Sequence, residues 1–141
     1  MEQLTVLYTA HATATGGRNG HITSSDNVLD LDVRMPRELG GSGGAYTNPE
    51  QLFAAGYAAC FDSALNHIIR LERAQTGNTS VTASVSINKN DEGGFALAVK
   101  LQVAIPDTDL SLAQSLMEKA HQVCPYSNAT RGNIDVILEL L

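Results

Sequence analysis

The chain has 141 residues, of which 43% are hydrophobic, and this length fits one globular domain spanning residues 1–141. Its formal net charge is −6 and no basic stripe is present, which argues against nucleic acid as the main partner. No apolar run approaches the length of a membrane span, and the N-terminus lacks the layout of a signal peptide. We therefore expect a cytoplasmic protein with no membrane partner.

The first third of the chain predicts a small antiparallel sheet. Residues 4–15 alternate between apolar and polar side chains, as a strand does, and the Gly- and Asn-rich residues 16–20 predict a turn because they accept positive φ. Residues 21–24 predict the return strand, and residues 28–33 alternate again. Residues 40–44, Gly-Gly-Ser-Gly-Gly, predict a mobile loop, and they lack the Gly-Lys-Ser/Thr of a phosphate-binding P-loop.

A long helix follows this loop. Asn48 can cap its N-terminus, Pro49 suits its first position, and Gln51 can complete a capping box. The apolar periodicity predicts a helix over about 49–75, with Gly77 ending it. The apolar face is broad, which is typical of a helix buried at the centre of a fold.

The second half predicts two more strands, a helix and a last strand. Residues 81–87 and 95–105 alternate cleanly, and the Asn- and Gly-rich residues 90–94 predict a hairpin between them. Residues 110–123 predict a second helix that ends before a proline, and residues 134–138 predict the last strand. The fold class is therefore α+β, with antiparallel sheets packed on a long central helix.

Two cysteines, Cys60 and Cys124, are the candidates for covalent chemistry. They form no Cys-x-x-Cys motif, and a permanent disulfide is not expected in a reducing compartment. Each also fits a simpler role, Cys60 as a core thiol in mid-helix and Cys124 as a packing residue at the end of the second helix. Free carbonyls at that helix end disfavour a thiolate, so Cys124 suits a resolving role better than an attacking one.

Arg18 and Glu50 are the candidate charged partners of these thiols. A mid-helix thiol such as Cys60 gains little from the helix N-terminus, so its activation requires a neighbouring cation. Arg18 lies between Gly- and Asn-rich residues at a hairpin tip, where an arginine often simply faces solvent. Glu50 lies in the first turn of the long helix, where a carboxylate also complements the helix dipole.

The sequence supports two other kinds of site, a metal site and a cysteine hydrolase, less well. The four histidines are scattered, and the short pair His121 and Cys124 does not complete a zinc-binding pattern, so we expect no metal and no cofactor. A cysteine hydrolase could pair Cys60 with His67 or His121. His67 lies about 10 Å further along the same helix, too far for a direct hydrogen bond.

Three segments together resemble a known family. Residues 8–20, 47–61 and 124–133 are similar to the organic hydroperoxide resistance (Ohr) branch of the Ohr/OsmC family, and the resemblance spans nearly the whole chain. It implies an intertwined homodimer with two active sites at the subunit interface. It also implies a thiol-dependent peroxidase that reduces organic hydroperoxides to alcohols and is recycled by dihydrolipoamide on lipoylated proteins. A non-enzymatic redox sensor and an OsmC-type peroxidase of broader substrate range stay as alternatives.

The same resemblance assigns roles to four residues. Cys60 would be the peroxidatic cysteine and Cys124 its resolving partner, while Arg18 and Glu50 would activate and orient Cys60. About 15 Å of helix rise separates Glu50 from Cys60 of the same chain, so we expect Glu50 to act at the Cys60 of a second subunit. Small residues on the long helix would allow two such helices to approach closely: Ala54, Ala55, Gly56, Ala58 and Ala59.

Overall fold

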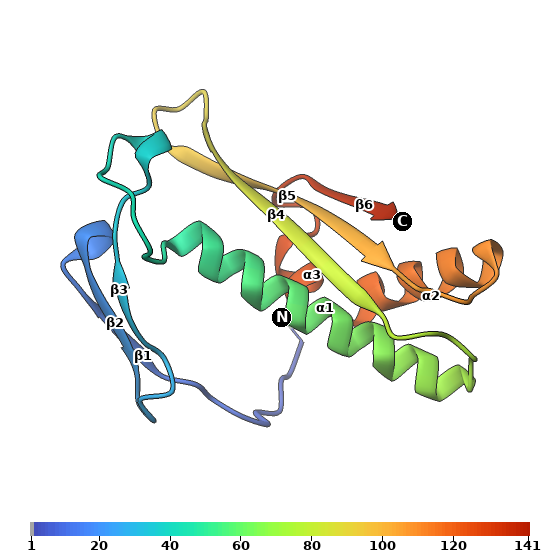
Figure 1. Ribbon diagram of the computed structural model, residues 1–141. Helices are drawn as coiled ribbons and strands as arrows, with labels where there is room; N and C mark the ends of the chain where they lie inside the picture. Colours follow the sequence, from blue (N-terminus) through green and yellow to red (C-terminus); the bar gives the residue numbers. More distant parts are fainter. Residues whose placement is uncertain (1) are drawn as a thin grey trace. The chain divides into compact units, whose positions relative to one another are not determined.

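The computed structural model describes residues 2–141, and the chain divides into two compact units, Met1–Pro49 and Glu50–Leu141. The first unit contains a three-stranded antiparallel sheet in the order β1-β2-β3 (Figure 1). Its strands are β1 (Ala12–Thr15), β2 (Gly20–Ser24) and β3 (Asp30–Val33). The predicted turn between β1 and β2 is a short 3₁₀ helix, Gly17–Asn19, and Gly16 enters it with a φ of 73°. A second 3₁₀ helix, Arg37–Leu39, follows β3.

The predicted first strand is much shorter than expected. Residues 4–15 alternate, but only Ala12–Thr15 forms β1, because β2 ends at Ser24, which pairs with Ala12. The residues before Ala12 therefore have no residue of β2 to pair with. Apolar side chains of the preceding segment are exposed: Leu4, Val6, Leu7 and Tyr8. The third strand also begins later than predicted, at Asp30 rather than at residue 28. The residues before it form a turn in which the Leu29 N–H donates to Ser24 Oγ.

The second unit contains three helices and a second three-stranded sheet. Its elements are α1 (Pro49–Glu72), β4 (Ser80–Lys89), β5 (Phe95–Ala104), α2 (Leu110–Val123), α3 (Pro125–Thr130) and β6 (Val136–Leu140). β4 and β5 pair antiparallel over their full length, as the hairpin prediction required. β6 pairs with the other edge of β5.

This second sheet is mixed, which corrects the expectation of purely antiparallel sheets. β6 runs parallel to β5, because α2 and α3 carry the chain back before β6 begins, and parallel neighbours need such a crossover. The last strand also begins at Val136 rather than at Ile134, since the Ile134 N–H is bonded to the Thr130 carbonyl at the end of α3. The α+β fold class is confirmed.

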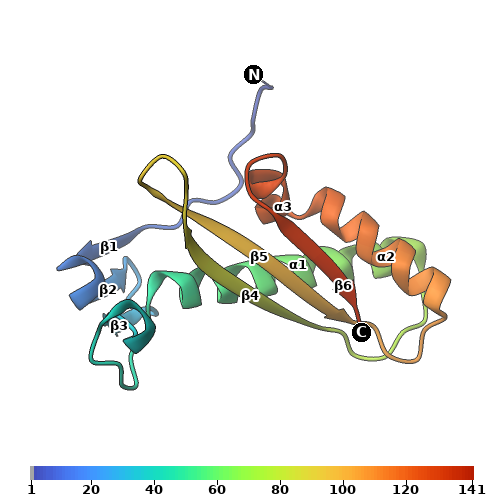
Figure 2. The ribbon, with the colours of Figure 1, turned by 90° about the horizontal axis from the view of Figure 1, so that it is seen from above.

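The core of the second unit lies between α1, α2 and one face of the β4-β5-β6 sheet (Figure 2). Helix α1 contributes the fully buried Tyr57, Phe61 and Leu65, and β5 contributes alternate residues such as Leu101 and Val103. The strict alternation of β5 and the broad apolar face of α1 therefore both serve this core. Within residues 2–141, no helix combines the length and the apolarity that crossing a membrane requires.

Helix α1 begins at Pro49 as predicted but ends at Glu72, three residues early. Arg73 adopts the left-handed conformation with a φ of 53°, and the Ala74 N–H bonds the Ile69 carbonyl at 3.0 Å. This is the hydrogen bonding of a helix C-terminus that glycine usually provides. Gly77, the expected end, instead donates its N–H to the Pro106 carbonyl.

Candidate active site

The two cysteines lie side by side in the second unit. Cys60 is on α1, Cys124 joins α2 to α3, and their sulfurs are 3.7 Å apart with both thiols free. A disulfide bond is about 2.05 Å long, so the sulfurs need to approach by less than about 2 Å to form one. Cys60 is partly exposed, whereas Cys124 is fully buried. A reagent from solvent therefore meets Cys60 first.

Helix α3 sets the position of Cys124, and the sequence pattern did not predict this helix. Pro125 ends α2, as expected, but it is also the first residue of the six-residue α3. Cys124 has the extended backbone that precedes a proline, and its carbonyl accepts the N–H of Asn128 at 3.0 Å. Proline favours the first position of a helix, so Pro125 both follows the end of α2 and marks the start of α3.

The surroundings of Cys60 within this unit favour the thiol over the thiolate. Burial raises the pKa of Cys60, a hydrogen bond from the Tyr126 backbone N–H lowers it, and the adjacent Cys124 raises it further. The net pKa lies above the ordinary value of a free cysteine. The Tyr126 N–H is a contact that sequence reasoning missed, because it depends on α3. Activation of Cys60 therefore requires positive charge beyond this backbone donor.

A groove of about 450 Å³ opens beside Cys60. Its lining includes Ser63, His67 and Arg70 from successive turns of α1, and Pro125 from α3. The groove gives a small molecule access to the Cys60 sulfur from one side. Its polar and cationic wall is formed by α1.

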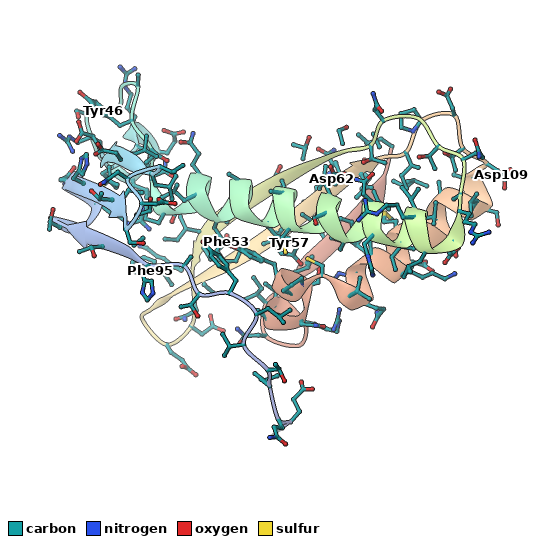
Figure 3. All side chains as sticks on the ribbon, turned by 90° about the horizontal axis from the view of Figure 1, so that it is seen from below. Tyr46, Phe53, Tyr57, Asp62, Phe95 and Asp109 are labelled. Carbon is teal, nitrogen blue, oxygen red and sulfur yellow. The ribbon has the colours of Figure 1, made fainter. Side chains whose placement is uncertain are left out.

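A second, apolar groove of about 310 Å³ shares Pro125 with the first. Phe53 and Tyr126 line it, and their rings meet edge to face with centroids 6.1 Å apart. Phe53 and Tyr57 project from the same side of α1 (Figure 3). Gly56 makes room for this cluster, because a Cβ there would lie 2.8 Å from Tyr126 Oη. The small size of Gly56 thus serves packing within the chain, and its role in a helix–helix approach stays a prediction.

Arg18 and Glu50 belong to different units of the chain. Arg18 lies in the 3₁₀ helix Gly17–Asn19 of the first unit, whereas Cys60 belongs to the second. Glu50 lies in the first turn of α1, about 15 Å of helix rise from Cys60. The roles of both residues at Cys60 stay predictions.

The histidines of this unit do not form a hydrolase-like pair with Cys60. Cys60 contacts the Cys124 thiol and the Tyr126 backbone, while His121 Nδ1 lies 2.8 Å from Ser127 Oγ. Among residues 2–141, no group of three His, Cys, Asp or Glu side chains is arranged to hold a metal ion.

Comparison with known proteins identifies the family. The family model described as OsmC-like protein matches residues 41–139. The organic hydroperoxide resistance protein of Xanthomonas axonopodis pv. citri is 57% identical over 136 residues, which cover 96% of this chain and 95% of that protein. The chain belongs to the organic hydroperoxide resistance branch of the OsmC family.

Solved structures of this branch have the same fold. The crystal structure of an organic hydroperoxide resistance protein from Elizabethkingia anophelis, with thiocyanate bound, has a TM-score of 0.94 at 58% identity and covers 97% of this chain and 98% of that one. OhrB of Bacillus subtilis has a TM-score of 0.89 at 50% identity and covers 96% of this chain and 100% of that one. The family resemblance read from the three sequence segments is therefore confirmed.

Proposed function

We propose that this protein is a thiol-dependent peroxidase that reduces organic hydroperoxides to alcohols. The observation that carries the proposal is the pair of free thiols 3.7 Å apart, of which Cys60 is partly exposed and Cys124 is buried. Pro125 lines both the groove that opens at Cys60 and the apolar groove. Its relatives are named organic hydroperoxide resistance proteins, which fits the same chemistry. The apolar groove favours alkyl and lipid hydroperoxides over hydrogen peroxide, because only the former have a carbon chain to bury there.

The reaction uses the two thiols in sequence. The Cys60 thiolate attacks the distal oxygen of the hydroperoxide, the O–O bond breaks, and the alkoxide leaves as an alcohol after taking a proton. Cys60 becomes a sulfenic acid. The Cys124 thiol then attacks the Cys60 sulfur and displaces water, which leaves a Cys60–Cys124 disulfide. Two electrons pass from the thiols to the peroxide, and a dithiol must return them.

Arg18 supplies the charge that Cys60 needs. Burial raises the pKa of Cys60, and a guanidinium beside the sulfur would counter that rise by stabilising the thiolate. Glu50 would hold the guanidinium through a bidentate pair and fix its direction. This role requires Arg18 to reach the Cys60 sulfur in the assembled protein.

The assembled protein is a homodimer in which both units of each chain act as one domain. In the described part of the first unit, Val33 is the one buried hydrophobic residue, so this sheet lacks a core of its own. On α1, the small residues Ala55 and Ala59 are exposed at helical spacing and leave space for a second helix. An intertwined dimer would cover both surfaces and would bring Glu50 of one subunit to the Cys60 of its mate.

Turnover assays with a choice of peroxide and reductant test the proposal. We expect dihydrolipoamide to support rapid reduction of cumene hydroperoxide, with slower reduction of hydrogen peroxide, and expect thioredoxin or glutathione to be poorer donors. Cys60→Ser should abolish turnover with every combination of peroxide and reductant. Equal use of all peroxides would favour a broader OsmC-type enzyme, and disulfide formation without turnover would favour a redox sensor.

Subunit mixing tests the shared site. Glu50→Ala chains and Cys60→Ser chains are each inactive by this account, but a heterodimer of the two carries one site with Cys60 from one chain and Glu50 from the other. We expect activity to reappear on mixing. If heterodimers form and activity does not exceed that of the separate variants, Glu50 does not act across the interface.

A further inference from the structure

A set of hydrogen bonds, buried or partly buried, links the three helices around the two thiols. Tyr57 Oη is 2.8 Å from Ser127 Oγ and 3.1 Å from Thr130 Oγ1, and Ser127 Oγ is 2.8 Å from His121 Nδ1. Tyr57 and Ser127 are 0% exposed and Thr130 is 4% exposed. These four side chains, Tyr57, His121, Ser127 and Thr130, are called here the hydroxyl chain. They connect α1, α2 and α3.

One arrangement of hydrogens satisfies every contact in the hydroxyl chain. Thr130 donates to the Ser127 carbonyl, so it accepts from Tyr57. Tyr57 then accepts from the Ser127 hydroxyl, and Ser127 accepts from His121 Nδ1–H. Burial lowers the pKa of His121, and the positive charge of Arg131 lowers it further, which keeps this imidazole neutral. Every hydroxyl of the hydroxyl chain therefore has a hydrogen-bond partner, and removing one hydroxyl leaves a buried polar group without its partner.

The hydroxyl chain fastens the part of α3 that contacts Cys60. Tyr57 lies one helical turn before Cys60 on α1, and Ser127 directly follows Tyr126, whose backbone N–H bonds the Cys60 sulfur. Cys124 precedes α3 and moves with it. A helix of six residues has little stability of its own, so its position depends on its side-chain contacts.

We infer that the hydroxyl chain positions α3 for the redox chemistry of Cys60, holding both the Tyr126 N–H and the Cys124 thiol against the Cys60 sulfur. This inference deepens the proposed function and rests on its use of the same two thiols. The Tyr126 backbone N–H lowers the pKa of Cys60, because a hydrogen bond to the sulfur favours the thiolate. Loosening α3 should therefore raise the pKa of Cys60 and slow disulfide formation about tenfold.

The experiment compares variants that remove a hydroxyl with variants that keep it. Tyr57→Phe keeps the buried ring and deletes Oη, and Thr130→Val keeps the side-chain shape and deletes Oγ1. Thr130→Ser keeps Oγ1 and should rescue both readouts. Thr79→Val is the matched control, because Thr79 bonds Asp62 of α1 at 2.6 Å and Asn66 at 3.0 Å in a separate network.

Two readouts avoid any dependence on peroxide turnover. The first is the pH midpoint for alkylation of Cys60 in the reduced protein. The second is the rate of Cys60–Cys124 disulfide formation after addition of diamide, an oxidant that converts two thiols to a disulfide. We expect a higher midpoint and slower closure in Tyr57→Phe and Thr130→Val, and wild-type values in Thr130→Ser and Thr79→Val.

The result that overturns the inference is a loss of thermal stability alone. If Tyr57→Phe and Thr130→Val lower Tm as Thr79→Val does and leave both thiol readouts unchanged, the hydroxyl chain only supports the fold. Should Tyr57→Phe fail to fold, the Thr130→Val and Thr130→Ser pair decides the question. A different outcome would refute the proposed function and leave this inference standing. In it, Tyr57→Phe and Thr130→Val raise the midpoint and slow disulfide closure as expected, but the wild-type protein does not reduce organic hydroperoxides.

Discussion

Adding one methyl group at Gly56 tests how the apolar groove is built. The Cβ of Gly56→Ala would lie 2.8 Å from Tyr126 Oη and 3.3 Å from two carbons of the same ring, so the ring must move. Alanine favours a helix interior over glycine by about 1 kcal/mol, and overpacking costs about 1–3 kcal/mol. We therefore expect a net loss of stability of about 0–2 kcal/mol, with the fold retained.

The displaced Tyr126 ring should alter substrate use more than stability. Tyr126 lines the apolar groove of about 310 Å³, so its movement changes the space for a carbon chain. Loss of about 1 kcal/mol of apolar contact corresponds to about a fivefold fall in kcat/KM for cumene hydroperoxide. Hydrogen peroxide, which is too small to fill the groove, should react at the wild-type rate. A coupled assay with dihydrolipoamide measures both substrates.

A double-mutant cycle with Tyr126→Phe supplies the refutation. Deleting Oη removes the 2.8 Å contact, so Gly56→Ala should have a smaller effect in that background than in the wild type. If the two substitutions are additive, or if Gly56→Ala slows both peroxides equally, the groove does not select the substrate through the Tyr126 ring.

Three further outcomes are expected. Cys124→Ser should reduce one equivalent of hydroperoxide and stop with a sulfenic acid on Cys60, which dimedone trapping and mass spectrometry detect. Arg18→Ala should raise the pKa of Cys60, seen as a higher alkylation midpoint, and an unchanged midpoint would remove Arg18 from the mechanism. A hydrogen bond to Asp32 raises the pKa of His21, so its stabilising effect is complete below about pH 6.5 and is lost as pH rises through the raised pKa. The Tm difference between wild type and His21→Gln should therefore shrink from pH 6 to pH 9, and a constant difference would contradict this pairing.

The elements that local patterns specify were predictable from the sequence. The β4–β5 hairpin follows from strict alternation around an Asn- and Gly-rich turn, and α2 has the predicted bounds. The N-terminus of α1 follows from Pro49 at its first position. In each case the signal lies within the element itself.

The remaining features depend on contacts that alternation does not encode. The segment before Ala12 alternates, yet a strand requires a partner, and β2 is too short to provide one. The parallel pairing of β6 follows from the crossover through α2 and α3, and no residue of β6 specifies it. Likewise, the family resemblance pairs Cys60 with Cys124, but the contact of Cys60 with the Tyr126 backbone and the hydroxyl chain both depend on the position of α3.

Stoichiometric oxidation of the reduced protein tests the central claim most directly. Cumene hydroperoxide is added in equal amount to the chains, without a reductant, and the products and thiols are counted. The account predicts one cumyl alcohol and one Cys60–Cys124 disulfide for each hydroperoxide consumed, with no reaction in Cys60→Ser. Hydroperoxide loss that leaves both thiols free, or that proceeds equally in Cys60→Ser, would contradict it.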